Sequence, residues 1–185
     1  MEINVQETNI GAFLALPVEK VYYPTINRLQ TELRLDLEHL PHAIRWTQSH
    51  RLHLTLFFLV RHSADEIKRI IYCIKHIKLS TKYEKITISC NQVQLFPEHR
   101  PTVVALTGNA SQALIRLREH IADCLKKAHI SPDLSHETNG FLPHVTLGRL
   151  EEATDLKAQP VAMNLIFNQL VLFKSELSDS PRSPY

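Results

Sequence analysis

The stretch LHLTL at residues 52–56 decides how the rest of the chain is interpreted, because it has a counterpart, PHVTL, at residues 143–147. Each stretch contains a histidine, an aliphatic residue, a threonine and a second aliphatic residue. Side chains two residues apart on a β-strand point to the same face. We therefore expect His53 and Thr55 to share one face of a strand, and His144 and Thr146 to share a face of another.

These residue types suggest chemistry at a phosphate. An imidazole gains or loses a proton near neutral pH, and a hydroxyl can donate a hydrogen bond to an oxyanion. A third His-x-Thr, at residues 136–138, lies in a polar run and is interpreted as a chance match. Chance supplies about 0.7 such tripeptides, but only about 0.05 with Val, Ile or Leu at both aliphatic positions. Two facing pairs could hold a phosphate and move protons on both sides of it.

Composition describes an ordinary globular protein of 185 residues, with 44% hydrophobic residues, 22% charged residues and a net charge of +2. That charge excludes a histone-like nucleic-acid binder and an acidic scaffold. The three cysteines, Cys73, Cys90 and Cys124, are scattered, which is typical of a reducing compartment and gives no metal-site spacing. No apolar segment approaches the ~20 residues that cross a bilayer. We expect a cytoplasmic protein that is monomeric and has no membrane association.

Hydrophobic periodicity predicts an alternation of strands and helices. Ser63 and Glu66 form a predicted capping box for the second helix. The strand expected to begin at Thr102 should end at Gly108. Strands are predicted at residues 10–16, 43–46, 51–59, 85–95, 102–106, 141–150 and 163–177, and helices at 19–37, from 63 onward and at 111–128. The order suggests an internal duplication in one two-lobed domain, residues 1–177, followed by a C-terminal tail, residues 178–185.

Further blocks support a family resemblance. They are AFLAL at 12–16, IRW at 44–46, LFP at 95–97 with RPTVVAL at 100–106, FLPHVTLGR at 141–149 and LFKSEL at 172–177. With both His-x-Thr strands, the sequence resembles the 2H (two-histidine) phosphoesterase superfamily. Within it, the chain is most similar to the bacterial and archaeal RNA 2′,3′-cyclic phosphodiesterases, historically called 2′-5′ RNA ligases.

The resemblance implies an α+β, two-lobed duplicated fold, with two mainly antiparallel sheets facing across a central cleft and helices outside. It implies hydrolysis of RNA 2′,3′-cyclic phosphate ends to 2′-phosphates without metal or cofactor, and it allows the reverse 2′-5′ ligation. The partner would be RNA or a nucleotide carrying a 2′,3′-cyclic phosphate. His53 would be the proton donor and His144 the proton acceptor, while Thr55 and Thr146 would bind the phosphate oxygens.

Three further residues are candidates for substrate binding. Arg149 belongs to the family motif, but strict alternation places it on the face opposite His144. A β-bulge, or the end of the strand near Gly148, would be needed to bring it to the site. Phe13 and Trp46 could stack on a nucleobase, with core packing as the alternative for each.

Two other functions fit the same residues. One keeps the site but acts on 2′,5′-linked oligonucleotides or small cyclic nucleotides. The other is a nucleotide-binding module without turnover. The absence of Gly-x-Gly-x-x-Gly and Walker-type loops argues against a dinucleotide or NTP cradle.

Overall fold

The computed structural model describes residues 10–37, 44–77, 79, 85–96, 101–134, 140–153 and 156–175. The three α-helices are α1 (Tyr23–Asp36), α2 (Ala64–Ile74) and α3 (Gln112–Lys127), and short 3-10 turns are formed by Lys20–Tyr22 and Ser49–Arg51. The strands are β1 (Ile10–Pro17), β2 (Arg45–Trp46), β3 (His53–His62), β4 (Ile86–Phe96), β5 (Val103–Ala110), β6 (His144–Arg149), β7 (Gln159–Phe167) and β8 (Val171–Lys174).

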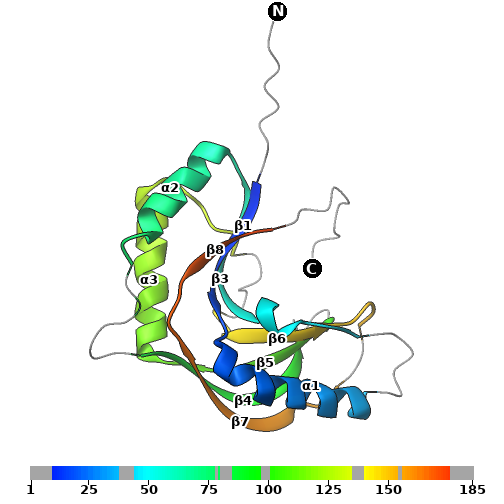
Figure 1. The fold of residues 1–185 in the computed structure, drawn as a ribbon. Helices are drawn as coiled ribbons and strands as arrows, with labels where there is room; N and C mark the ends of the chain where they lie inside the picture. The colour runs from blue at the N-terminus through cyan, green and yellow to red at the C-terminus, as the bar shows by residue number, and fades with distance from the viewer. Residues whose placement is uncertain are drawn as a thin grey trace, which may run out of the picture.

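Over the described residues the strands form one curled sheet in the order β7-β4-β5-β6-β3-β1-β8, with β2 beside β6 (Figure 1). All these pairings are antiparallel. We call β1, β3 and β8 the first lobe, and β2 and β4 to β7 the second lobe. The lobes are joined by one residue pair, Leu54 with Val145. The predicted α+β class and antiparallel pairing are confirmed, and the two predicted sheets meet edge to edge through this pair.

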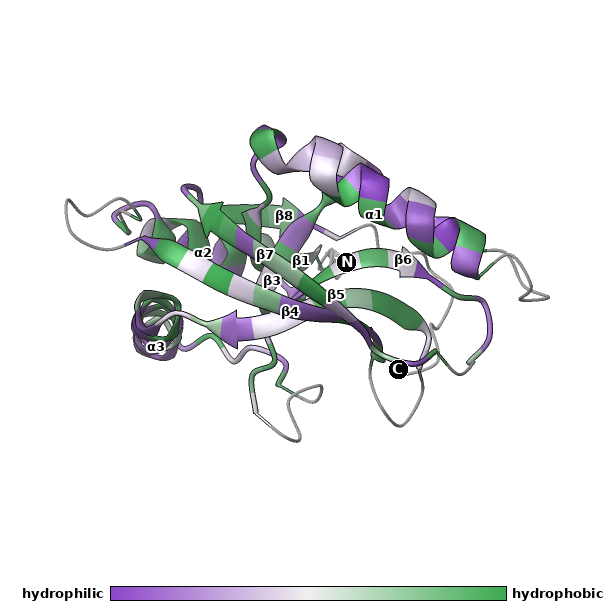
Figure 2. Ribbon diagram, turned by 90° about the horizontal axis from the view of Figure 1, so that it is seen from below, coloured by the Kyte–Doolittle hydropathy of each residue, from purple (hydrophilic) through white to green (hydrophobic). Residues whose placement is uncertain are grey.

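The helices pack on the sheet through apolar residues at helical spacing. Ile26 and Leu33 of α1 are buried, as are Leu114, Ile121 and Leu125 of α3. α2 and α3 lie together on one side of the molecule, and α1 lies beside the second lobe (Figure 1). The Ile166 amide of β7 donates to the Tyr22 hydroxyl just before α1, at 3.2 Å. The ribbon of α1 is coloured largely hydrophilic in Figure 2, and its apolar residues Ile26 and Leu33 are fully buried.

The predicted starts of α2 and α3 agree with the structure, whereas the helix predicted from residue 19 begins as a 3-10 turn. Ser63 accepts a hydrogen bond from the Glu66 amide and the Glu66 carboxylate accepts one from the Ser63 amide, so the capping box is confirmed. Ser111 caps α3 in a similar way, accepting from the Leu114 amide. α1 begins at Tyr23, after a 3-10 turn, with proline in its first turn.

Two strand predictions are wrong. The segment predicted as one strand over 163–177 is two strands, β7 pairing with β4 in the second lobe and β8 pairing with β1 in the first. The break lies at Asn168–Leu170, where the chain passes between lobes. β5 does not end at Gly108 but continues to Ala110, which pairs with Ile88 of β4. A Cβ at Gly108 would clash with the Ser89 carbonyl oxygen. Gly108 is there to let the neighbouring backbone approach.

The pairing of Leu54 with Val145 predicts a stability effect. Leu54 is 0% exposed where the lobes meet, so Leu54→Ala should lower the free energy of unfolding by about 2–5 kcal/mol. Leu35→Ala is the control, because Leu35 is 67% exposed and its loss should change that free energy by about 0.5 kcal/mol or less. Urea denaturation measures both. Equal effects of the two substitutions would contradict the account.

Candidate active site

The junction between the lobes brings the two His-Thr pairs together. Because β3 and β6 are antiparallel with Leu54 opposite Val145, His53 lies across from Thr146 and Thr55 lies across from His144. All four side chains are half-buried and share one face of the sheet, while Leu54 and Val145 are buried on the other. We call the face with the histidines the site face. The third His-x-Thr, at 136–138, lies outside the described residues.

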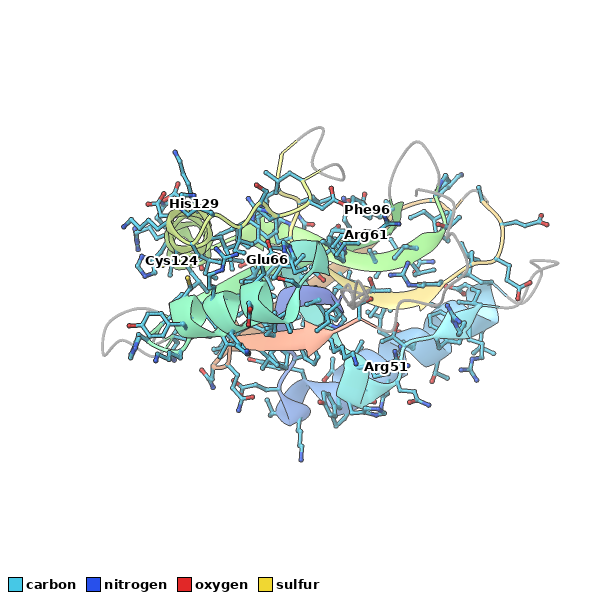
Figure 3. All side chains as sticks on the ribbon, turned by 90° about the horizontal axis from the view of Figure 1, so that it is seen from above. Arg51, Arg61, Glu66, Phe96, Cys124 and His129 are labelled. Carbon is cyan, nitrogen blue, oxygen red and sulfur yellow. The ribbon has the colours of Figure 1, made fainter. Side chains whose placement is uncertain are left out.

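Both imidazole rings are held in the same way. The His53 Nδ1–H donates to the Arg51 carbonyl oxygen at 2.6 Å, and the His144 Nδ1–H donates to the Leu142 carbonyl oxygen at 2.9 Å. A carbonyl oxygen only accepts, so these contacts put the proton of each neutral ring on Nδ1. Each Nε2 is then left to take up or deliver a proton at the site face. Arg51 lies just before β3, on the side of α1 (Figure 3).

The surroundings keep both rings largely neutral near neutral pH. Burial lowers the pKa of His53 from its ordinary value of 6.5. The hydrogen bond to the Arg51 carbonyl opposes this in part, and the positive charges of His144, Arg149 and Arg51 lower the pKa further. Burial also lowers the pKa of His144, again helped by Arg149. Because the unfolded chain binds these protons at higher pH than the folded chain does, the histidines should make stability fall as the pH drops below about 6.5. A neutral ring suits proton acceptance, whereas a ring that donates a proton from Nε2 must first take up a second proton.

Arg149 reaches the site face through a β-bulge. Ala105 of β5 pairs with Thr146, but the next residue, Val104, pairs with Gly148, so Leu147 is the extra residue in β6. The bulge reverses the alternation, and Arg149 shares the face of Thr146. Its positive charge lowers the pKa of both histidines. The bulge that the sequence analysis required is therefore present.

A matching bulge in β3 assembles an aromatic row on the first lobe. There the extra residue is Leu56, and Phe58 pairs with Phe13 of β1. Phe13 also pairs with Phe173 of β8, and their ring centroids lie 5.1 Å apart in a stacked arrangement. Phe13 stacks on His53 at 4.9 Å, and Phe173 lies 5.7 Å from the same ring. We call Phe13, Phe58 and Phe173 the aromatic row.

The second lobe presents a more polar surface on the same face. Phe96, labelled in Figure 3, ends β4. Its ring centroid lies 4.6 Å from that of His144. The register places Gln92 and Gln94 on the face of Thr107 and Ala105, and the Gln92 amide donates to Gln94 at 2.8 Å. An exposed arginine, Arg45 of β2, pairs directly with Arg149.

The sequence analysis gave a role to Phe13 but none to Phe58, Phe96, Phe173 or Arg45. Phe96 and Phe173 each lie inside a block that resembles the family, which was an available signal. Their position beside a histidine depends on which strands are neighbours in the sheet. The face on which Phe58 lies depends on the bulge in β3. The position of Arg45 beside Arg149 depends on the short pairing of β2 with β6.

Trp46 is not brought to the site. It pairs with Gly148, on the face opposite Arg149, and a Cβ at Gly148 would lie 3.2 Å from the indole ring. The guanidinium of Arg34, in α1, lies 5.9 Å from the same ring. Trp46 therefore packs between the bulge in β6 and α1. Of its two predicted roles, base stacking and core packing, the structure favours core packing.

Metal clusters and membrane-spanning helices are both absent from the described residues. No group of three or more His, Cys, Asp or Glu side chains among them is placed to hold a metal ion. No helix in that part of the chain is both long and apolar enough to cross a membrane.

Comparison with known proteins places the chain in a family. Residues 17–174 match the model of the 2′-5′ RNA ligase superfamily, so the chain belongs to that superfamily and is a 2H phosphoesterase. No curated protein matches the sequence.

Solved structures share the fold at low sequence identity. TT0787 of Thermus thermophilus is similar with a TM-score of 0.70 and 20% identity, covering 91% of this chain and 90% of that one. E. coli LigT complexed with 3′-AMP has a TM-score of 0.66 and 19% identity, covering 92% and 90%. The MHV ns2 PDE domain has a TM-score of 0.61 and 16% identity, covering 89% and 99%.

The site makes a prediction about proton binding. NMR titration of the ring protons should show His53 and His144 titrating below 6.5, and Arg149→Met should raise both pKa values because a nearby positive charge is removed. Arg28→Met, on the exposed surface of α1, should leave them unchanged. Histidines that titrate at or above 6.5 in the unsubstituted protein would refute this electrostatic description.

Proposed function

We propose that the protein hydrolyses 2′,3′-cyclic phosphate ends of RNA to 2′-phosphates, without a metal ion, and can carry out the reverse 2′-5′ ligation. The observation that carries this proposal is the cross-strand arrangement of His53 opposite Thr146 and Thr55 opposite His144. It brings two imidazoles and two hydroxyls together on one face of the sheet, where the lobes meet. Membership of the 2′-5′ RNA ligase superfamily supports the same substrate class.

The reaction needs a base and an acid on opposite sides of phosphorus. In the proposed hydrolysis, His144 Nε2 takes a proton from water as the water oxygen bonds to phosphorus. The bond from phosphorus to the ribose 3′ oxygen breaks, and His53, which must enter the reaction with a second proton on Nε2, protonates that oxygen. The product carries a 2′-phosphate and a free 3′-hydroxyl. Each proton transfer of this kind contributes roughly 10²–10⁴-fold to the rate.

The threonines and Arg149 would stabilise the phosphate as the bonds change. The hydroxyls of Thr55 and Thr146 donate to the non-bridging oxygens, where negative charge builds in the transition state. Arg149 lies on the same face through the bulge and adds a guanidinium, which suits a phosphate group.

The difference between the lobes gives the substrate a direction. The aromatic row (Phe13, Phe58 and Phe173) offers stacking surfaces for a nucleobase beside His53. The second lobe offers Arg149, with Arg45 directly beside it, to the charged backbone. The terminal base would therefore stack on the first lobe and the phosphates would lie toward the second.

The remaining parts of the proposal concern the whole molecule. We propose that the protein acts as a monomer in the cytoplasm, on RNA or nucleotides carrying a 2′,3′-cyclic phosphate, and needs no cofactor. The functional unit would be one two-lobed domain over residues 1–177, and the proposed tail, 178–185, lies outside the described residues.

The direct test is incubation with the four nucleoside 2′,3′-cyclic phosphates in EDTA, with identification of the product by chromatography. We expect 2′-phosphates at an undiminished rate, and a loss of kcat/KM of about 10²-fold in Thr55→Val and in Thr146→Val. Thr31→Ala, on the exposed surface of α1, is the control that should retain activity.

The other outcomes separate the competing functions. A 3′-phosphate product, or activity abolished by EDTA, would contradict the proposal. Cleavage of 2′,5′-linked oligonucleotides, with no activity on 2′,3′-cyclic phosphates, would favour an enzyme that keeps this site but acts on 2′,5′-linked substrates. Tight nucleotide binding with no product over hours would favour the binding module.

A further inference from the structure

The two strands that carry the His-Thr pairs, β3 and β6, each have a bulge three residues after the histidine, and a helix side chain donates a hydrogen bond to a carbonyl oxygen in each bulge. The extra residues at these two bulges are Leu56 in β3 and Leu147 in β6. A bulge interrupts the regular ladder, so its backbone groups need other partners. One partner of each bulge carbonyl is a side chain of α1 or α3.

Gln30 of α1 is the partner in β6. Its side-chain Nε2 donates to the Leu147 carbonyl oxygen at 2.9 Å and to the Thr47 carbonyl oxygen at 2.9 Å. The Thr47 amide also donates to the Leu147 carbonyl, at 2.9 Å. Both donors of the Gln30 amide are therefore used, and the bulge carbonyl accepts two hydrogen bonds, which is its full capacity.

The position of Gln30 is unusual for a polar side chain. It is 7% exposed and lies on the face of α1 that also carries the buried Ile26 and Leu33. An unpaired amide at such a position is costly. Burial of a polar residue on an apolar helix face is explained by the two carbonyl oxygens that it satisfies.

The first lobe repeats this arrangement with a different residue. Arg118 of α3 donates from Nε to the Leu56 carbonyl oxygen at 3.4 Å, and its guanidinium lies over the rings of Phe57 and Phe141 at 4.7 and 4.2 Å. A donor therefore reaches the equivalent bulge carbonyl in both lobes. In each case the helix belongs to the other half of the chain.

We propose that Gln30 is a positioning residue, which holds the bulge at Leu147 and so keeps Arg149 on the same face as His144 and Thr146. Without the bulge, regular alternation would place Arg149 on the opposite face, with Val145 and Leu147. Gln30 contacts none of these reacting groups itself. The inference rests on the proposed function only in its kinetic consequence, because the position of Arg149 is a structural claim.

The test compares Gln30→Met with Arg149→Met and the double variant. Met has a similar length and no donor, so Arg149 should leave the site. NMR titration should then show the pKa values of His53 and His144 rising in Gln30→Met as they do in Arg149→Met, with no further rise in the double variant. This readout needs no substrate, so it stands even if the proposed reaction is wrong.

Kinetics supply a second readout. Gln30→Met and Arg149→Met should each lower kcat/KM on a 2′,3′-cyclic nucleotide by about 10- to 100-fold, the loss expected for one hydrogen bond to a charged group. The double variant should be no worse than either single variant, because both remove the same contact. Effects that multiply would show that Gln30 acts independently of Arg149 and would overturn the proposal.

Two controls separate positioning from general damage. Thr31→Ala, next to Gln30 on the exposed side of α1, should change neither readout. Arg118→Met disturbs the other bulge and should leave the effect of Arg149 on the histidine pKa values intact. If Gln30→Met does not fold, Gln30→Asn replaces it, because its shorter amide cannot reach both carbonyls. Unchanged histidine pKa values in a folded Gln30 variant would refute the proposal.

Discussion

The pairing of Leu54 with Val145 is the interaction on which the rest of the structure depends. It joins two lobes that have no other strand pairing between them in the described part of the chain. In an antiparallel pair, this single contact fixes which residues lie opposite each other, and so sets both His-Thr pairs on one face. The aliphatic residues between each histidine and threonine, Leu54 and Val145, thus have a specific role, because their burial on one face places the histidines on the other.

The site is nearly symmetric in its frame and asymmetric in its chemistry. Both histidines donate from Nδ1 to the carbonyl two residues earlier, and both strands have a bulge three residues after the histidine. The residue that each bulge delivers differs, Phe58 in the first lobe and Arg149 in the second. A nucleotide also has one apolar, stackable part and one charged part, and the difference between the lobes matches that polarity.

Much of this could be predicted from the sequence, because it depends on local alternation. The shared face of His53 and Thr55, the capping box at Ser63 and the helical stripes all follow from residue spacing. The division of the last strand into β7 and β8 could not be obtained in this way, because periodicity does not reveal that the chain changes lobes. The same limit applies to Phe173, whose place beside His53 is set by β8 pairing with β1.

Arg149 shows why some features of the site could not be predicted from the sequence. Alternation alone placed it on the wrong face, and the bulge that corrects this is held by Gln30, which is 117 positions away from Leu147 in the sequence. Trp46 shows the converse, since its pairing with Gly148 turns it toward α1 although its motif resembles the family's. Features set by contacts between distant segments are not encoded in local spacing.

The central claim is that His53 and His144 act on the same phosphate as one unit. A double-substitution cycle measures this most directly, with kcat/KM determined on a 2′,3′-cyclic nucleotide for His53→Ala, His144→Ala and the double variant. The account predicts a loss of about 10²–10⁴-fold or more in each single variant and little further loss in the double variant. Full activity in either single variant, or losses that multiply in the double variant, would contradict it.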